Sequence, residues 1–284
     1  MAILLALFSA FAYGLSDFVG GLLSRRASAW PVATVAQLSA MICTATAAVF
    51  VPGSAGGGDL GWGLLAGLGT GIGTGFLYRG FASGRMSVVA PVSGVGAAVV
   101  PVLVGALAGE RLSAMVWTGI ALALPGIWLV SSTTEELPPE GAPPPRASLA
   151  EGVLDGILAG LGFGVLFAAL GQVPESAGLW PLALAQVVAL PAVVGLAVAV
   201  RAPWVPREPV TWWALVAGPL GATATTAFLL STQRGYLTVA GVLASLYPAS
   251  TVILAALVLR EKVHRAQGTG LTLCALAIVL VVGG

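Results

Sequence analysis

The feature that most constrains this chain is a series of long apolar runs that recurs from one end to the other. Each run holds about 18–22 residues, and a helix of that length crosses roughly 30 Å of hydrocarbon. The runs lack the alternation of barrel strands, and helices satisfy their own backbone polar groups in lipid. We therefore predict an all-α integral membrane protein with ten transmembrane helices. The predicted spans are 3–23, 30–51, 61–81, 87–108, 114–131, 153–171, 180–200, 211–232, 238–259 and 266–283.

The composition excludes a soluble globular domain. Of the 284 residues, 58% are hydrophobic and 8% are charged, whereas soluble domains carry about 25% charged residues. No basic tract is present that would bind nucleic acid. The single histidine, His264, has no cysteine or second histidine near it, so we expect no metal site and no cofactor. We expect a multi-pass protein of the cell membrane, either inner or plasma membrane, in contact with the lipid bilayer.

The two halves of the chain repeat each other, and Glu110 matches Glu261 at the same offset that relates several glycines and tryptophans. Each half has five spans, an odd number, so the second copy must enter the membrane from the opposite side. Such inverted repeats are typical of transporters, whose sites lie near mid-membrane between the halves. We predict a first repeat at 1–131, a polar, proline-rich linker at 132–152 and a second repeat at 153–284.

Short motifs in matching places of the two halves indicate a family. The pieces GERL and REKV follow the fourth and ninth spans, and the proline-containing segments PVSGVGAAVVP and SLYPAS precede them. With these motifs the chain resembles two-domain EamA proteins of the drug/metabolite transporter (DMT) superfamily over nearly its whole length. The resemblance implies an exporter or exchanger of small metabolites, with two bundles that rock around a cavity lined by helices 1, 3, 4, 6, 8 and 9. Within this superfamily the chain is similar to the YddG-like group of amino-acid exporters.

Asp17 is the only ionisable residue in the apolar run from Ile3 to Leu23. A charge at mid-bilayer costs at least about 2.5–3.5 kcal/mol on insertion scales, so we expect Asp17 to face a cavity or a partner. Three roles stay open at this point. Asp17 is a counter-ion for a substrate ammonium, a proton site, or a structural partner. For the structural role Arg79 is the obvious cation, since span 3 ends on the same side of the membrane.

Span 3 carries two sets of small or polar residues at helical spacing. Thr70, Thr74 and Tyr78 share one face, and we predict that they line a polar pathway. The alternative is that the hydroxyl groups bond to their own backbone carbonyls, which is common in membrane helices. A second face is made of glycines, which predicts close packing against a neighbouring helix. These glycines are Gly67, Gly71 and Gly75.

Spans 4 and 9 carry prolines, which remove a backbone donor and free a carbonyl. Breaks in matching places of two halves are the best sequence indicator of a transporter's binding site, and a simple kink is the alternative. The prolines are Pro91, Pro101 and Pro248. The nearby residues that we assign to the substrate site are Ser93, Ser245 and Tyr247.

Span 6 places Phe163 and Phe167 one helical turn apart, where they match Tyr13 and Asp17 of the first half. Their rings could stack on an organic substrate or hold a cation, and packing is the alternative. We assign all four residues, together with Ser16, to the predicted substrate site. No set of residues resembles a catalytic centre, so we expect no enzymatic activity.

Acidic residues also follow the fourth and ninth spans at the membrane interface. We expect Glu110 and Glu261 to pair with their basic neighbours Arg111 and Lys262, or to cap the next helix. The orientation of the chain stays open. Ten Lys and Arg residues lie on one side and two on the side of the termini, which places the termini outside. The family resemblance implies the reverse.

These observations predict a secondary transporter that moves small organic metabolites by alternating access, with export of amino acids or related amines as the first choice. The alternatives are a sugar-phosphate or nucleotide-type exchanger and a cationic-drug exchanger. A passive channel and a membrane enzyme are the alternatives from other classes. We expect a small-molecule substrate, a coupling proton as an option, no nucleic-acid partner and a monomer.

Overall fold

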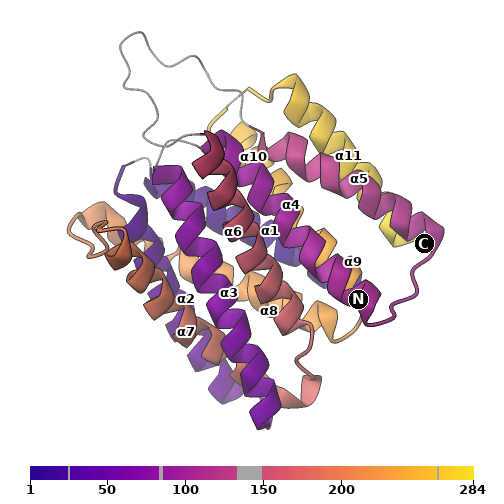
Figure 1. Ribbon diagram of the computed structural model, residues 1–284, viewed down its shortest axis with the longest axis horizontal. Helices are drawn as coiled ribbons and strands as arrows, with labels where there is room; N and C mark the ends of the chain where they lie inside the picture. Colours follow the sequence, from indigo (N-terminus) through magenta and orange to yellow (C-terminus); the bar gives the residue numbers. More distant parts are fainter. Residues whose placement is uncertain (25, 83–85, 133–148, 261) are drawn as a thin grey trace.

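The computed structural model describes residues 1–24, 26–82, 86–132, 149–260 and 262–284. Within these ranges every regular element is helical, and the helices run side by side in one bundle (Figure 1). The α-helices are α1 (Ala2–Ser24), α2 (Ala29–Phe50), α3 (Gly57–Ala82), α4 (Met86–Leu107), α5 (Ala114–Ser131), α6 (Leu149–Leu170), α7 (Trp180–Ala199), α8 (Ala217–Thr232), α9 (Leu237–Ala244), α10 (Tyr247–Val258) and α11 (Arg265–Gly283). Two 3₁₀ helices are η1 (Glu175–Ala177) and η2 (Pro209–Leu215).

The ten predicted spans are confirmed in the described part of the chain by ten helical segments that are long and apolar enough to cross a membrane. Two of these segments are composite, because η2 continues into α8 and α9 continues into α10. Helix α6 begins at Leu149, inside the range predicted as a linker. The remainder of that range, 133–148, lies outside the described residues.

The expectation of matching breaks in the fourth and ninth spans is wrong for the fourth. Helix α4 is continuous through Pro91 and Pro101. Its repeat counterpart is interrupted, because α9 ends at Ala244 and α10 begins at Tyr247, with Pro248 in the first turn of α10. The second repeat therefore has a discontinuous helix where the first repeat has a continuous one.

Close packing against α6 supports the continuity of α4. Gly96 of α4 lies directly against Gly160 of α6, and a Cβ added at Gly96 would lie 2.9 Å from the Cα of Gly160. The residue that matches Gly96 in the second repeat is Tyr247, whose ring cannot fit such a contact. Contact between two backbones holds α4 along α6, and the same position in the second repeat has a bulky side chain at the start of α10.

The glycine face predicted on α3 is confirmed as a helix-packing surface. Side chains added at these glycines would collide with α7: one at Gly67 would meet the backbone of Ala185, and one at Gly71 would meet Ala192. Gly75 would likewise meet Leu196. Because α3 belongs to the first repeat and α7 to the second, this surface joins the two halves of the protein.

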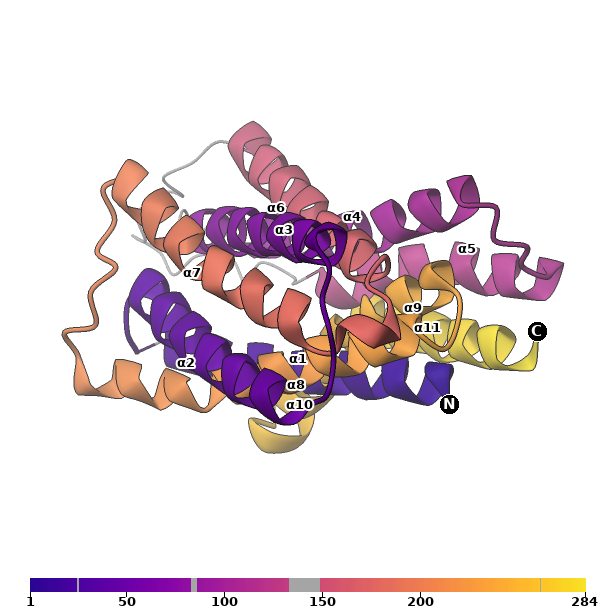
Figure 2. The same ribbon diagram turned by 90° about the horizontal axis from the view of Figure 1, so that it is seen from below.

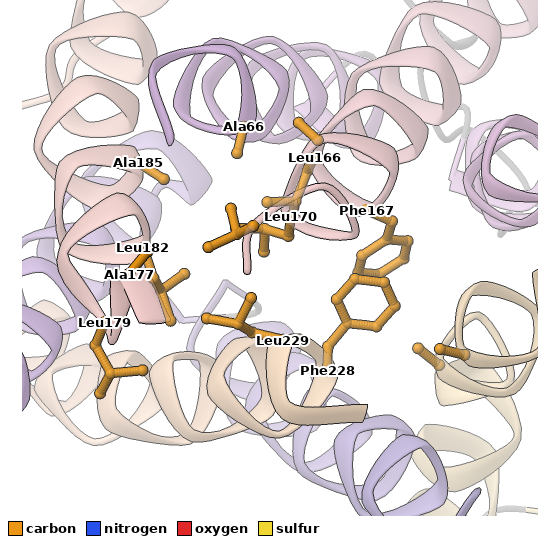
Figure 3. Close-up of a cluster of buried hydrophobic side chains, with 14 of the residues drawn as sticks. Ala66, Leu166, Phe167, Leu170, Ala177, Leu179, Leu182, Ala185, Phe228 and Leu229 are labelled. Atoms are coloured by element: carbon orange, nitrogen blue, oxygen red, sulfur yellow. The ribbon is translucent and has the colours of Figure 1, made fainter. Parts of the chain in front are cut away.

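Both chain termini lie at one end of the bundle, which we call the termini end (Figure 2). The hydroxyl of Ser231, near the end of α8, donates a hydrogen bond of 2.8 Å to the carbonyl of Ala2 at the start of α1. A buried apolar cluster fills the centre between the helices there (Figure 3). Leu170, Phe228 and Leu229 of this cluster have no exposed surface. The centre of the bundle is therefore packed shut toward the termini end.

Candidate functional site

Along the inner face of α1 the side chains change from buried to exposed. Ala6, Ala10, Tyr13 and Asp17 follow one another at spacings of three and four residues, so they share one face. Ala6 and Ala10, toward the termini end, are 0% and 4% exposed. Tyr13 is half-buried and Asp17 is exposed. The interior of the bundle is thus accessible at Asp17 and closed beyond Tyr13.

Asp17 lies among three tyrosines from three different helices. Its charge acts electrostatically on the hydroxyl groups of Tyr13, Tyr78 and Tyr247. The hydroxyl of Tyr78 also lies 3.6 Å from where a Cβ would stand at Gly20, on the same face of α1. We call Asp17 and these three residues the tyrosine–aspartate site. Among the described residues, none forms a hydrogen bond or ion pair with the Asp17 carboxylate.

Aromatic rings separate this site from the termini end. The Tyr13 ring meets the edge of Phe167 at a centroid distance of 5.9 Å, and it lies 6.2 Å from the ring of Tyr247. Phe167 stacks in turn on Phe228 at 4.5 Å (Figure 3). Phe167 is only 3% exposed, so its packed ring closes the tyrosine–aspartate site on the side of the termini end.

Two hydrogen bonds tie α1 to α8 beside the site. The Tyr13 hydroxyl donates to Oγ1 of Thr225 at 3.0 Å, and the Ser16 hydroxyl donates to the carbonyl of Ala217 at 2.9 Å. The bond to Thr225 fixes the orientation of the Tyr13 ring. Thr225 was not among the predicted site residues. The repeat supplied a signal for it, because Thr225 is the counterpart of Thr74.

Two of the four predicted hydroxyl residues of α3 and α4, Thr70 and Ser93, bond locally. Thr70 donates to the carbonyl of Ala66 at 2.9 Å, and Ser93 donates to the carbonyl of Ala90 at 3.0 Å. Ser93 is 1% exposed, while Thr74 is half-buried on the same face as Thr70. The alternative of hydroxyls that satisfy their own backbone therefore holds for Thr70 and Ser93.

Phe163 and Ser245 lie apart from the tyrosine–aspartate site. The Phe163 ring packs against Gly73 of α3, in an interface between helices. Ser245 occupies the break between α9 and α10 and is fully buried. Its hydroxyl has no hydrogen-bond partner in the part of the chain that the structure describes. Phe163 thus contributes packing, and Ser245 leaves one polar atom unsatisfied at the helix break.

Arg79 has a different partner from the one expected. Its Nε donates a hydrogen bond of 2.8 Å to Oδ1 of Asp155 in α6, and its guanidinium lies 4.6 Å from the ring centre of Phe76. Asp155 is 2% exposed and the Arg79 side chain is 39% exposed, so this ion pair joins the two repeats with a buried acid and a partly exposed cation. The suggested pairing of Asp17 with Arg79 is wrong. Asp155 had the same sequence signal as Asp17, a lone acid within an apolar span.

Glu110 also binds where the sequence did not indicate. Its two carboxylate oxygens accept hydrogen bonds from the backbone N–H groups of Leu237 and Thr238, at 2.6 and 3.1 Å. Leu237 and Thr238 are the first residues of α9, in the other repeat. Glu110 therefore does not cap the next helix, α5, and does not pair with Arg111. Helix α5 is capped instead by Ser113. Glu261, the counterpart of Glu110, lies outside the described residues.

Two hollows occur away from the tyrosine–aspartate site. One of about 430 Å³ lies at the termini end between α1, α5, α9 and α11, and one of about 330 Å³ lies between α1, α2 and α8. Neither is lined by a predicted site residue. Among the described residues no group of three His, Cys, Asp or Glu could hold a metal ion.

Comparison with known proteins gives a family and a fold. The model of the EamA-like transporter family matches residues 1–132 and 150–283. No curated protein matches the sequence. A solved structure described only as "Crystal structure of protein" superposes with a TM-score of 0.73 over 98% of this chain and 95% of that chain. The sequence identity is 16%, so this likeness concerns the fold alone.

Proposed function

The chain belongs to the EamA-like transporter family, and on that premise we propose that it exports amino acids or related amines across the cell membrane by alternating access. The family is one of multi-pass membrane transporters for small molecules rather than of enzymes. The proposed transporter works as a monomer, since the tyrosine–aspartate site is formed by helices of one chain.

One observation carries this proposal: the carboxylate of Asp17 is exposed on the inner face of α1 and has no partner among the described residues. A charge at this depth needs compensation. A substrate ammonium group supplies it, because hydrogen bonds to charged groups contribute about 1.5–3 kcal/mol. The rings of Tyr13 and Tyr247 add attraction for a cation of about 0.5–2 kcal/mol.

The same charge argues against anionic substrates. A sugar phosphate or nucleotide would bring its negative charge toward Asp17 and meet repulsion. A cationic drug would be accepted on the same grounds as a metabolic amine, so this alternative stays compatible with the site. When no amine is bound, a proton is the natural replacement at Asp17. We therefore propose a proton as the coupling ion.

Alternating access is supported by the difference between the two ends of the bundle. The apolar cluster of Leu170, Phe228 and Leu229 closes the termini end, while Asp17 is exposed. Such a molecule has the site accessible from one side only. The discontinuous pair α9–α10 places Tyr247 at the site, and breaks of this kind in transporters adjoin the substrate.

The test is transport by the purified protein in liposomes. Saturable uptake and counterflow should occur with amino acids or amines and not with sugar phosphates. Asp17→Asn should lower transport efficiency about 10–100-fold, the equivalent of one charged hydrogen bond. Glu175→Gln, an exposed acid in η1, is the matched control and should change nothing. Amine transport that is unaffected by Asp17→Asn would falsify the role of Asp17, and flux without saturation or counterflow would indicate a channel.

A further inference from the structure

Glu110 is held in place by the way in which α4 ends. Gly109 adopts a positive φ of 85°, a conformation that glycine accepts at no steric cost. The N–H of Glu110 donates to the carbonyl of Gly105 at 3.0 Å, and the N–H of Gly109 donates to that of Ala106 at 3.1 Å. This pair of bonds is the Schellman arrangement that terminates many helices. The backbone of Glu110 is therefore fixed relative to α4, and its side chain projects from a rigid point.

Helix α9 begins without a cap of its own. The residue at its N-cap position is Tyr236, whose side chain makes no capping hydrogen bond. Helix α5, by contrast, is capped by its own Ser113, and α11 has a capping box with His264. The first N–H groups of a helix need an acceptor. For α9 this acceptor comes from the other repeat, because Glu110 accepts from both Leu237 and Thr238.

The contact lies where the two repeats close the termini end. Leu237 and Thr238 are 6% and 1% exposed, and Leu237 packs directly on Gly171 at the end of α6. Farther along α9, Gly241 packs on Pro101 of α4. Opening this end would require α9 to separate from α4, which would break both hydrogen bonds of Glu110. It would also leave two N–H groups at the start of α9 without acceptors.

The same helix leads directly to the tyrosine–aspartate site. All but one residue of α9 is buried, and three residues after its end the chain reaches Tyr247, which lies beside Tyr13. A movement of α9 at the termini end would therefore be transmitted to the site through the break at Ser245. Glu110 touches none of the site residues, so it acts through α9.

We propose that Glu110 is a positioning residue that latches the termini end shut, by binding the start of α9 from the opposite repeat. The latch sets the balance between the state described here and a state open at the termini end. This inference rests on alternating access as part of the proposed function, and it is independent of which substrate is carried. A glutamine at position 110 removes the negative charge and puts an amide N–H₂ donor where one carboxylate oxygen accepted, so it holds the two N–H groups less strongly.

The test measures accessibility at both ends of the bundle. In a background with Cys43→Ala and Cys274→Ala, single cysteines are placed at Ala169, 1% exposed in the cluster at the termini end, and at Gly21, where a Cβ meets no atom within 4 Å. The protein is labelled in nanodiscs with a membrane-impermeant maleimide. Glu110→Gln should raise the labelling rate at position 169 about tenfold and lower it at position 21. Glu208→Gln, at an exposed acid directly before η2, is the control here and should leave both rates unchanged.

A second variant separates the latch from a simple helix cap. Tyr236 is 51% exposed, and Tyr236→Asp gives α9 a local N-cap of a strongly preferred type. The double variant Glu110→Gln/Tyr236→Asp should recover thermal stability and keep the raised labelling at position 169. It also carries the test if Glu110→Gln alone fails to fold.

Two results would overturn the proposal. One is labelling of Glu110→Gln at the wild-type rate at both positions. The other is a double variant whose labelling returns to the wild-type rate, because Glu110 would then be a cap and no latch. The labelling needs no substrate, so its outcome is separate from that of the amine-transport assay. Failure of amine transport with the expected labelling would reject the proposed substrate and keep the latch.

Discussion

Helices α1 and α6 open the two repeats, and Asp17 of α1 and Asp155 of α6 both lie within apolar spans, yet the two carboxylates have opposite surroundings. Asp17 of α1 is exposed and has no partner among the described residues. Asp155 of α6 is 2% exposed and bound to Arg79. The comparison teaches that a lone acid in a membrane span has two distinct uses. A buried, paired acid holds helices together, and an accessible, unpaired one is available to a ligand.

The inner faces of α1 and α6 also differ in polarity and in accessibility. Tyr13 and Asp17 of α1 occupy the places that Phe163 and Phe167 occupy in α6. On α6 these places are packed, Phe163 against Gly73 and Phe167 against Phe228. On α1 they are polar, and they are accessible at Asp17. The two copies thus share the helix and its position. The first copy supplies polar side chains at these places, and the second supplies packed apolar ones.

The largest effect is expected from removing the buried acid. Asp155→Ala leaves the Arg79 guanidinium without its partner, and losing a hydrogen bond between charged groups costs about 1.5–3 kcal/mol of unfolding free energy, because the Arg79 side chain is 39% exposed and stays partly solvated. Thermal unfolding in detergent measures the loss. The double variant Asp155→Ala/Arg79→Met should recover most of it, because no charge is then left unpaired. Normal stability of Asp155→Ala would mean that both acids are dispensable for folding, and the contrast with Asp17 would disappear.

A smaller effect is expected where α1 meets the discontinuous helix. A Cβ at Gly14 would lie 2.8 Å from the carbonyl oxygen of Tyr247 and close to Ser250. Gly14→Ala should push α1 away from α10 and cost about 1–3 kcal/mol, with a matching loss of transport. Gly21→Ala is the control, since its Cβ would meet no atom within 4 Å. Equal stability of the two variants, measured by thermal unfolding, would show that α1 is not closely fitted to α10.

The smallest effect is expected from making α1 more like α6. Tyr13→Phe removes the hydrogen bond to Thr225 and keeps the ring that meets Phe167. One neutral hydrogen bond contributes about 0.5–1.5 kcal/mol, so KM for the transported amine should rise about 2–10-fold. Tyr236→Phe, at an exposed tyrosine, is the control. A loss as deep as that of Asp17→Asn would mean that the tyrosine hydroxyl, and not the carboxylate, dominates recognition.

The sequence predicts well what depends on position along one helix. The ten spans follow from the length of apolar runs, and the contact surface of Gly67, Gly71 and Gly75 follows from their common face. Partners across the bundle could not be predicted in this way. Arg79 chooses Asp155 over Asp17 because α6 lies against α3, and Glu110 reaches α9 because the repeats cross at the termini end. Neither adjacency is encoded in a local pattern.

The prolines show the same difference between what one helix determines and what its neighbours determine. Pro91, Pro101 and Pro248 each mark a missing backbone donor, and this much is local. Whether the helix breaks depends on its neighbours. Gly96 packs against Gly160 in the continuous helix α4, while the second repeat has Tyr247 in that place, beside the break. Composition therefore indicates where a break can occur, and packing with the opposite repeat decides whether it does.

The glycine surface of α3 has a consequence for how such a chain arises. Gly67 and Gly71 are filled by α7 of the other repeat, and α6 lies along both α3 and α4. A single repeat in a membrane would expose these bare backbones to lipid, where they could pack against a second copy of opposite orientation. The molecule is thus built like two subunits of a dimer joined into one polypeptide. Once the copies are joined, each is free to diverge, and an acid can be kept in one copy and lost from the other.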